Sequence, residues 1–452
     1  MIFFTGLMGL VLMGSGYPGA AQAATAVGLA AKPKIHRESP WNSWNSRTLY
    51  EINVRHYSAE GTLKAVTQDL TRIKSLGVGT LWLMPIQPLG ILGRKGSLGS
   101  PYSIRDYTAV NPDMGSEEDL RALVNTAHSL DMKVILDWVA NHTAWDNTWT
   151  LHHRDFFTLD REGRFISPVP DWSDVIDLDY SSKGLRVAMI EAMQYWLRKA
   201  DVDGFRCDVA SMVPTDFWFE ARPKLEEVKP LFMLAESDAQ DLSPGAFNAT
   251  YNFQVHKALR QLAKGQMNGD QLWSTMISEY QRFPETAQLM NFTTNHDENS
   301  WGGTNEQLYG KATAAFMTFI FTIPGIPLIY NGEEAGLDKQ LSFFDKDQIV
   351  WRDHPFQKLY SQLNKLRKQL PIMQSNWKQL QRVPIQGPRE SVLAYQPAPQ
   401  VLVIMNLSGK QQTFRLPVGG SFGDFLTDES LELKESEYLQ FAPWQYQILV
   451  RR

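Results

Sequence analysis

Short apolar segments typical of strands alternate with amphipathic segments along most of this chain. The apolar segments are LYEINVRHY (49–57), GTLWLMP (79–85), KVILDWV (133–139), DGFRCDV (203–209), LFMLAES (231–237), AQLMNFTT (287–294) and GIPLIYNG (325–332). Between them, apolar residues recur at helical spacing, as at Leu120, Leu123, Val124 and Ala127. Repeated strand-then-helix units predict a parallel sheet whose strands are joined by helices.

The number of these units favours an α/β fold in which the sheet closes into a (β/α)8 TIM barrel. Seven or eight units fit a barrel of about 250 residues with insertions. A doubly wound open sheet is the alternative, but it should carry a glycine-rich phosphate turn after its first strand, and none follows residues 49–57. We predict a catalytic barrel over residues 46–375. An excursion after the third strand, residues 143–180, forms an inserted subdomain beside the active site.

The two ends of the chain differ from the barrel. From residue 380 to 452, short strands with polar turns predict an antiparallel β-sandwich domain. At the other end, an apolar run followed by Ala21-Gln22-Ala23 predicts a signal peptide over residues 1–23 and a linker over 24–45. No Lys or Arg precedes the run, so a retained anchor is the alternative. We expect a secreted protein, periplasmic or extracellular, with no membrane span once the signal is removed.

Composition excludes some classes of binding partner and one kind of stabilisation. The net charge is −5 and no long block of one sign occurs, which argues against nucleic acid as a partner. The single cysteine, Cys207, excludes an internal disulfide, so the apolar core has to stabilise the chain.

The segment over residues 203–209 looks buried yet carries Arg206 and Asp208, and buried charges are costly unless they are paired. Because side chains alternate along a strand, Arg206 and Asp208 face one side and Cys207 the other. Asp208 then lies at the C-terminal end of a barrel strand, where barrel enzymes keep catalytic groups. We predict that Arg206 keeps Asp208 ionised and oriented; a purely structural salt bridge is the alternative.

Other predicted strands also end in polar residues. Glu236 ends one strand, His296 and Asp297 end a later one, and the third ends in Asp137, Asn141 and His142. The C-terminal ends of barrel strands meet on one rim, so these side chains should converge. Cleavage of a glycosidic bond needs two carboxylates, one as acid and one as base or nucleophile. Zinc is the competing interpretation, but H-E-x-x-H and His-x-His spacings are absent.

Five motifs, in order along the chain, resemble those of the α-amylase family of glycoside hydrolases (glycoside hydrolase family 13). They are LDWVANH (136–142), VIDLDY (175–180), GFRCD (204–208), MLAE (233–236) and FTTNHD (292–297). The resemblance runs from about residue 46 to the end of the chain. It implies retaining hydrolysis of α-1,4-glucosidic bonds in starch-like glucans or maltooligosaccharides, through a covalent glycosyl-enzyme intermediate.

The resemblance also implies roles for single residues. Asp208 would be the nucleophile, Glu236 the general acid/base and Asp297 the residue that stabilises the transition state. Substrate binding is implied for four further residues, Tyr102, His142, Arg206 and His296, with Tyr102 as the stacking platform under the sugar. A calcium site is implied at Asn141 and Asp177, and no organic cofactor is expected.

Two alternatives to an α-amylase stay open at this point. Within the same chemistry, the chain could be an α-glucosidase, a cyclomaltodextrinase or a transglycosylase. A more remote alternative is a non-catalytic barrel that binds only sugar or a partner, although such relatives lose the carboxylates that this chain keeps.

Overall fold

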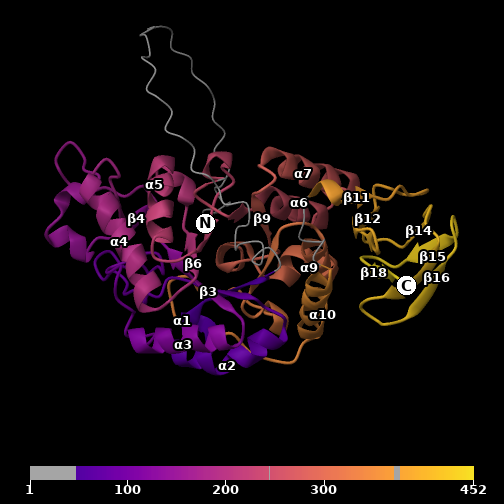
Figure 1. Cartoon of the computed structure of the whole chain (residues 1–452), viewed down its shortest axis with the longest axis horizontal. Coiled ribbons are helices and arrows are strands. Elements are labelled where there is room, and N and C mark those ends of the chain that lie inside the picture. Colours follow the sequence, from indigo (N-terminus) through magenta and orange to yellow (C-terminus); the bar gives the residue numbers. More distant parts are fainter. Residues whose placement is uncertain (1–46, 244, 371–376) are drawn as a thin grey trace, which may run out of the picture.

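Eight parallel strands form a closed barrel in the computed structural model, which describes residues 47–243, 245–370 and 377–452 (Figure 1). The predicted signal peptide (1–23) and linker (24–45) lie outside the described residues. The barrel strands are β1 (Leu49–Ile52), β2 (Thr80–Leu83), β3 (Lys133–Trp138), β6 (Gly204–Cys207), β7 (Phe232–Ala235), β8 (Ala249–Tyr251), β9 (Gln288–Asn291) and β10 (Ile326–Tyr330). Their order around the barrel is β1-β10-β9-β8-β7-β6-β3-β2. The predicted barrel is confirmed.

The observed strands are shorter than the predicted segments, and one strand was not predicted. The strand expected over residues 49–57 ends at Ile52, and Val54–Tyr57 form the short helix α1. The chain turns at Asn53, whose backbone N–H donates to the Asn331 side chain. Strand β8 was not predicted, because three residues are too few to show an alternating pattern. It is defined by pairing with both neighbours: Ala249 is opposite Leu234 of β7, and Thr250 is opposite Leu289 of β9.

Helices cover the outside of the barrel, and the barrel interior has its own apolar core. The longer helices are α2 (Leu63–Ser75), α3 (Glu117–Ser129), α4 (Lys183–Lys199), α5 (Thr215–Glu226), α6 (Phe253–Ala263), α7 (Gly269–Arg282), α9 (Thr313–Thr322) and α10 (Pro355–Gln369), with the short α8 (Asn305–Tyr309) before α9. Helix α3 begins at a capping box in which Ser116 and Asp119 bond each other's backbone N–H. Within the described ranges, none of the helices is long and apolar enough to span a membrane.

The excursion after β3 contains a small antiparallel sheet of β4 (His142–Ala144) and β5 (Val175–Asp177). The C-terminal strands are β11 (Gln381–Arg382), β12 (Val392–Ala398), β13 (Val401–Asn406), β14 (Gln412–Arg415), β15 (Gly420–Asp424), β16 (Ser430–Leu433), β17 (Tyr438–Phe441) and β18 (Tyr446–Arg451). They form a six-stranded antiparallel sheet and the pair β14–β17, with a shared core that includes Leu402, Phe414 and Phe441. Figure 1 shows this domain (yellow) and the excursion with β4 at opposite ends of the molecule.

Candidate active site

One buried guanidinium joins three carboxylates at the mouth of the barrel. Arg206 Nη1 lies 2.9 Å from Asp137 Oδ1 and 2.8 Å from Asp208 Oδ1, and Nη2 lies 2.8 Å from Glu236 Oε1. Strand register explains the convergence, because Asp137 is opposite Arg206 between β3 and β6, and Cys207 is opposite Ala235 between β6 and β7. Asp208 and Glu236 are the next residues in that register. The predicted carboxylate pair is therefore brought together directly after two adjacent strands.

The Arg206 guanidinium contacts two carboxylates in addition to Asp208, and this sharing affects the pKa of Asp208. The Arg206 side chain is fully buried, and Cys207 faces the helix layer in the outer core, as the alternation predicted. Burial above all, and then the charge of Glu236, raise the pKa of Asp208 well above its ordinary value, while Arg206 lowers it. One cation cannot neutralise three buried carboxylates, so this cluster favours keeping a proton. Arg206 does favour the ionised form of Asp208, as predicted, but it is shared with Asp137 and Glu236.

The residue after Asp208 adopts an unusual backbone conformation. Val209 has φ 35° and ψ 48°, a left-handed geometry that β-branched residues rarely adopt. This turn directs its N–H to Glu236 Oε2, at 2.8 Å. Glu236 is thus held by Arg206 on one oxygen and by a backbone donor on the other. Nothing in the sequence signals this contact, because valine is a poor residue for such a turn.

Asp297 lies in a second group with His296, Tyr102 and Glu51. His296 Nε2 lies 2.7 Å from the Tyr102 hydroxyl and 3.3 Å from Asp297 Oδ2, and Nδ1 bonds Glu51. The Tyr102 hydroxyl donates in turn to Asp137 Oδ2 at 3.1 Å, which links the two groups. Burial by itself lowers the pKa of His296, but the charges of Asp297 and Glu51 and the bond to Glu51 raise it to about 9. Sequence analysis missed Glu51, which lies in β1, far from His296 in the chain.

The predicted platform and the remaining histidine are also at this rim. Tyr102 is only 7% exposed and its ring stacks on His296, with centroids 5.4 Å apart, so its role as a sugar platform stays a proposal. Burial lowers the pKa of His142 to about 4, so its ring is neutral at neutral pH. The Asn141 amide lies 3.2 Å from His142 Nδ1 and can donate to it, which leaves Nε2–H for a sugar hydroxyl.

The residues predicted to bind calcium do not form an oxygen cage. Asn141 and Asp177 lie where the excursion leaves the barrel, but the Asn141 amide faces His142 and the Asp177 carboxylate accepts from Thr158 at 2.6 Å. The Asn141 carbonyl accepts the N–H of Leu178. No group of three or more His, Cys, Asp or Glu suited to a metal occurs in the part of the chain that the structure describes.

Backbone carbonyls that could complete a calcium shell are engaged by tyrosines. The Tyr107 hydroxyl donates to the carbonyls of Val139 and His142, and the Tyr180 hydroxyl donates to the carbonyl of Ala140. Calcium needs six to eight oxygen ligands. The calcium site stays a prediction, and we derive no step of the reaction from it.

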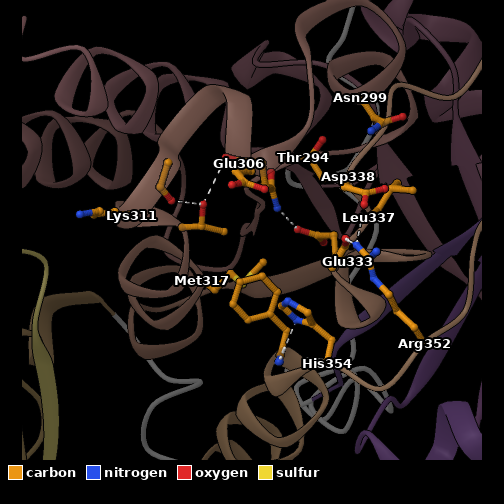
Figure 2. Close-up of a pocket in the computed structure, with 15 residues that line it drawn as sticks. Thr294, Asn299, Glu306, Lys311, Met317, Glu333, Leu337, Asp338, Arg352 and His354 are labelled. Carbon is orange, nitrogen blue, oxygen red and sulfur yellow. Dashed lines mark hydrogen bonds and ion pairs between the residues drawn. The ribbon is translucent and has the colours of Figure 1, made fainter.

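A cavity of about 440 Å³ is lined by Thr294, Asn299 and Glu333, among others, and by no residue of the carboxylate cluster (Figure 2). Glu333 faces it from the end of β10 and accepts hydrogen bonds from Thr293, Asn305 and the backbone N–H of Tyr330. Burial raises the pKa of Glu333 to about 7. The bond to Thr293 fixes the segment between β9 and His296. Glu333 therefore helps to position His296 and Asp297 without contacting the carboxylate cluster.

Replacing Glu51 with glutamine is expected to shift the alkaline limb of the pH profile of kcat/KM to lower pH, by about one unit. The doubly protonated His296 ring can donate from both nitrogens, one to Glu51 and one toward Tyr102 and Asp297. The pKa of His296 is near 6.5 in the unfolded chain and about 9 in the folded protein. The hydrogen bonds of the charged ring are therefore complete below pH 6.5 and are lost as the pH rises through about 9. Removing the Glu51 charge lowers the pKa of His296. The exposed Glu60→Gln is the control; an unchanged alkaline limb in Glu51→Gln would contradict the assignment.

Comparison with known proteins shows similarity to α-amylases in sequence and in overall fold. The family model "Alpha amylase, catalytic domain" matches residues 33–168 and 169–362. Alpha-amylase MalA of Haloarcula japonica is 27% identical over 405 residues, which cover 84% of this chain but only 58% of that relative's length. An alpha-amylase structure from Lactobacillus plantarum is 32% identical, with a TM-score of 0.81 over 90% of this chain and 99% of that chain. A maltogenic alpha-amylase structure from Thermotoga neapolitana is 29% identical, with a TM-score of 0.80 over 90% and 98% of the two chains.

Proposed function

Since the chain belongs to the α-amylase family, whose catalytic-domain model covers most of it, we propose that it hydrolyses α-1,4-glucosidic bonds with retention of anomeric configuration. The substrates are starch-like glucans or maltooligosaccharides. The observation that carries the proposal is the pair Asp208 and Glu236, which directly follow two adjacent strands and contact one guanidinium. Retaining enzymes need their two carboxyl groups about 5–5.5 Å apart, and this shared contact supports such a close spacing.

The two carboxyl groups perform the two steps of the reaction in this proposal. Asp208 attacks the anomeric carbon, while Glu236 donates its proton to the leaving oxygen, so a glycosyl ester forms and the glycosidic bond breaks. Glu236, now ionised, then removes a proton from water, which attacks the same carbon and releases Asp208. Two inversions leave the product with the α-configuration of the substrate.

The neighbouring groups set up these steps. Arg206 stabilises the departing Asp208 carboxylate and holds Glu236. The Val209 N–H holds the second oxygen of Glu236, so the orientation of the carboxyl group is fixed. Asp297, beside the charged His296, is placed to bind ring hydroxyls and to stabilise positive charge on the sugar. His142 supplies a neutral donor.

The test is the anomeric form of the first product, followed by proton NMR during hydrolysis of maltopentaose. We expect the α-anomer to be released before mutarotation, since the reaction passes through two inversions. β-Product appearing first would exclude Asp208 as nucleophile. Thin-layer chromatography of the same digests distinguishes α-amylase action from that of an α-glucosidase, cyclomaltodextrinase or transglycosylase, which share this chemistry. Hydrolysis of none of the glucans would favour the remaining alternative, a binding barrel.

A further inference from the structure

A row of aromatic rings leads from the carboxylate cluster to the surface. The rings of Tyr102 and Phe343 are nearly parallel, at 14°, with centroids 6.2 Å apart. The ring centroids of Phe343 and Trp301 lie 5.3 Å apart, and those of Trp301 and Phe344 lie 5.9 Å apart. Trp301 lies in the π-helical turn Glu298–Gly302, which directly follows Asp297. Despite these contacts it is 61% exposed, so a large part of its ring faces solvent at the rim of the site.

The segment that carries the two phenylalanines is firmly attached to its neighbours. The backbone N–H of Leu341 donates to the Asn299 side chain at 2.9 Å, and the carbonyl of Phe344 accepts the N–H of Leu98 at 3.0 Å. Asp345 accepts the N–H of Ser97 at 2.7 Å. Trp301 therefore rests against a preorganised wall, which lowers the entropy cost of presenting its ring to a ligand.

The order of the strands places this wall on one side of the bond that is cleaved. Tyr102 follows β2 and Phe343 follows β10, and these two strands flank β1. In the closed order of eight strands, β1 is opposite β7, and Glu236 directly follows β7. The leaving group must lie beside the acid that protonates it. Tyr102 and Phe343 therefore lie on the other side, where the non-reducing part of the substrate extends. Trp301 follows β9 and reaches this side by packing its ring on Phe343.

We propose that Trp301 is the stacking platform for the sugar next to the cleaved one on the non-reducing side. This inference rests on the glycosidase function proposed above. The apolar C–H face of a glucose ring packs on an indole ring and removes both from water. The remaining ring contacts of Trp301, to Phe343 and Phe344, hold its orientation. Trp301 then makes the enzyme depend on a second sugar before the scissile bond, and so sets its preference for maltosyl over glucosyl units.

The test compares Trp301→Ala with the parent enzyme on two substrates that share one leaving group, 4-nitrophenyl α-maltoside and 4-nitrophenyl α-glucoside. Only the maltoside reaches Trp301 when nitrophenol is released. We expect kcat/KM on the maltoside to fall about 10- to 100-fold, the loss typical of an aromatic burial, and kcat/KM on the glucoside to change less than about twofold. Trp301→Phe should keep most of the activity on the maltoside. Tyr438→Ala, at an exposed aromatic of the C-terminal domain, should alter neither substrate.

A binding measurement covers the case in which cleavage of the glucoside is too slow to follow. In the Asp208→Asn background, titration calorimetry with maltotriose should show about 10-fold weaker binding after Trp301→Ala. Equal losses on both aryl substrates would mean that Trp301 only positions Asp297, and unchanged maltotriose binding would exclude stacking; either result overturns the inference. A parent enzyme that cleaves neither substrate and does not bind maltotriose would instead contradict the proposed function.

Discussion

Asp208→Asn is expected to lower kcat on maltooligosaccharides by about 10⁴-fold or more, because the amide cannot form the glycosyl ester. The substitution should not destabilise the folded state. Asn keeps an acceptor for Arg206 Nη1, and it removes one of three buried carboxylates that share a single cation. Burial and the charge of Glu236 already raise the pKa of Asp208, so the ionised carboxylate costs the folded state a desolvation free energy that a neutral amide avoids. We therefore expect a melting temperature equal to or above that of the parent.

Steady-state kinetics and thermal unfolding of the same preparation check this result. The control is Asp216→Asn, an exposed carboxylate paired with Arg186 at the surface, which should leave kcat unchanged. Residual activity above about one per cent would place the nucleophile elsewhere. A large fall in melting temperature would mean that Asp208 has a structural role in addition to a chemical one.

Arg206→Met is expected to reduce the free energy of unfolding by about 3–5 kcal/mol at pH 7.5, the usual result when one partner of a buried ion pair is removed. The guanidinium is fully buried and contacts Asp137, Asp208 and Glu236, so its removal leaves three carboxylates without a cation. Activity should be lost as well, because Glu236 and Asp208 lose their common anchor.

The pH dependence distinguishes charge from packing in this variant. Burial raises the pKa of Asp137 and of Asp208, and losing the cation raises both further. The variant's folded state therefore takes up protons more readily than its unfolded state. Relative to the parent, its instability should shrink as the pH falls from 7.5 to 5. Urea unfolding at the two pH values measures this, with the exposed Arg164→Met as control. An equal loss at both values would point to the packing of Arg206 over Trp82, where the guanidinium carbon lies 5.0 Å from the ring centroid.

Local pattern was sufficient for the barrel and for the positions of the main candidate residues. Alternating apolar segments and amphipathic helices predict parallel strands, and the C-terminal ends of such strands share one rim, so Asp208, Glu236 and Asp297 could be expected near one another. Strand β8 was not predicted because a three-residue strand has no measurable period, and only its pairing with β7 and β9 defines it. The continuous strand over residues 49–57 was wrong because its end depends on a contact of Asn53 with a distant asparagine.

The contacts that tune the site were decided only by the tertiary structure. Arg206 looked like the partner of Asp208, yet closure of the barrel also brings Asp137 and Glu236 to it, and that sharing changes the protonation of the cluster. Glu51 meets His296 only because the first strand closes the barrel against the last. The amino-acid sequence determines which groups stand at the strand ends, since periodicity is a property of neighbouring residues. Which of those groups share a proton, a cation or a ring face is decided by distances across the barrel, and these exist only once the sheet has closed.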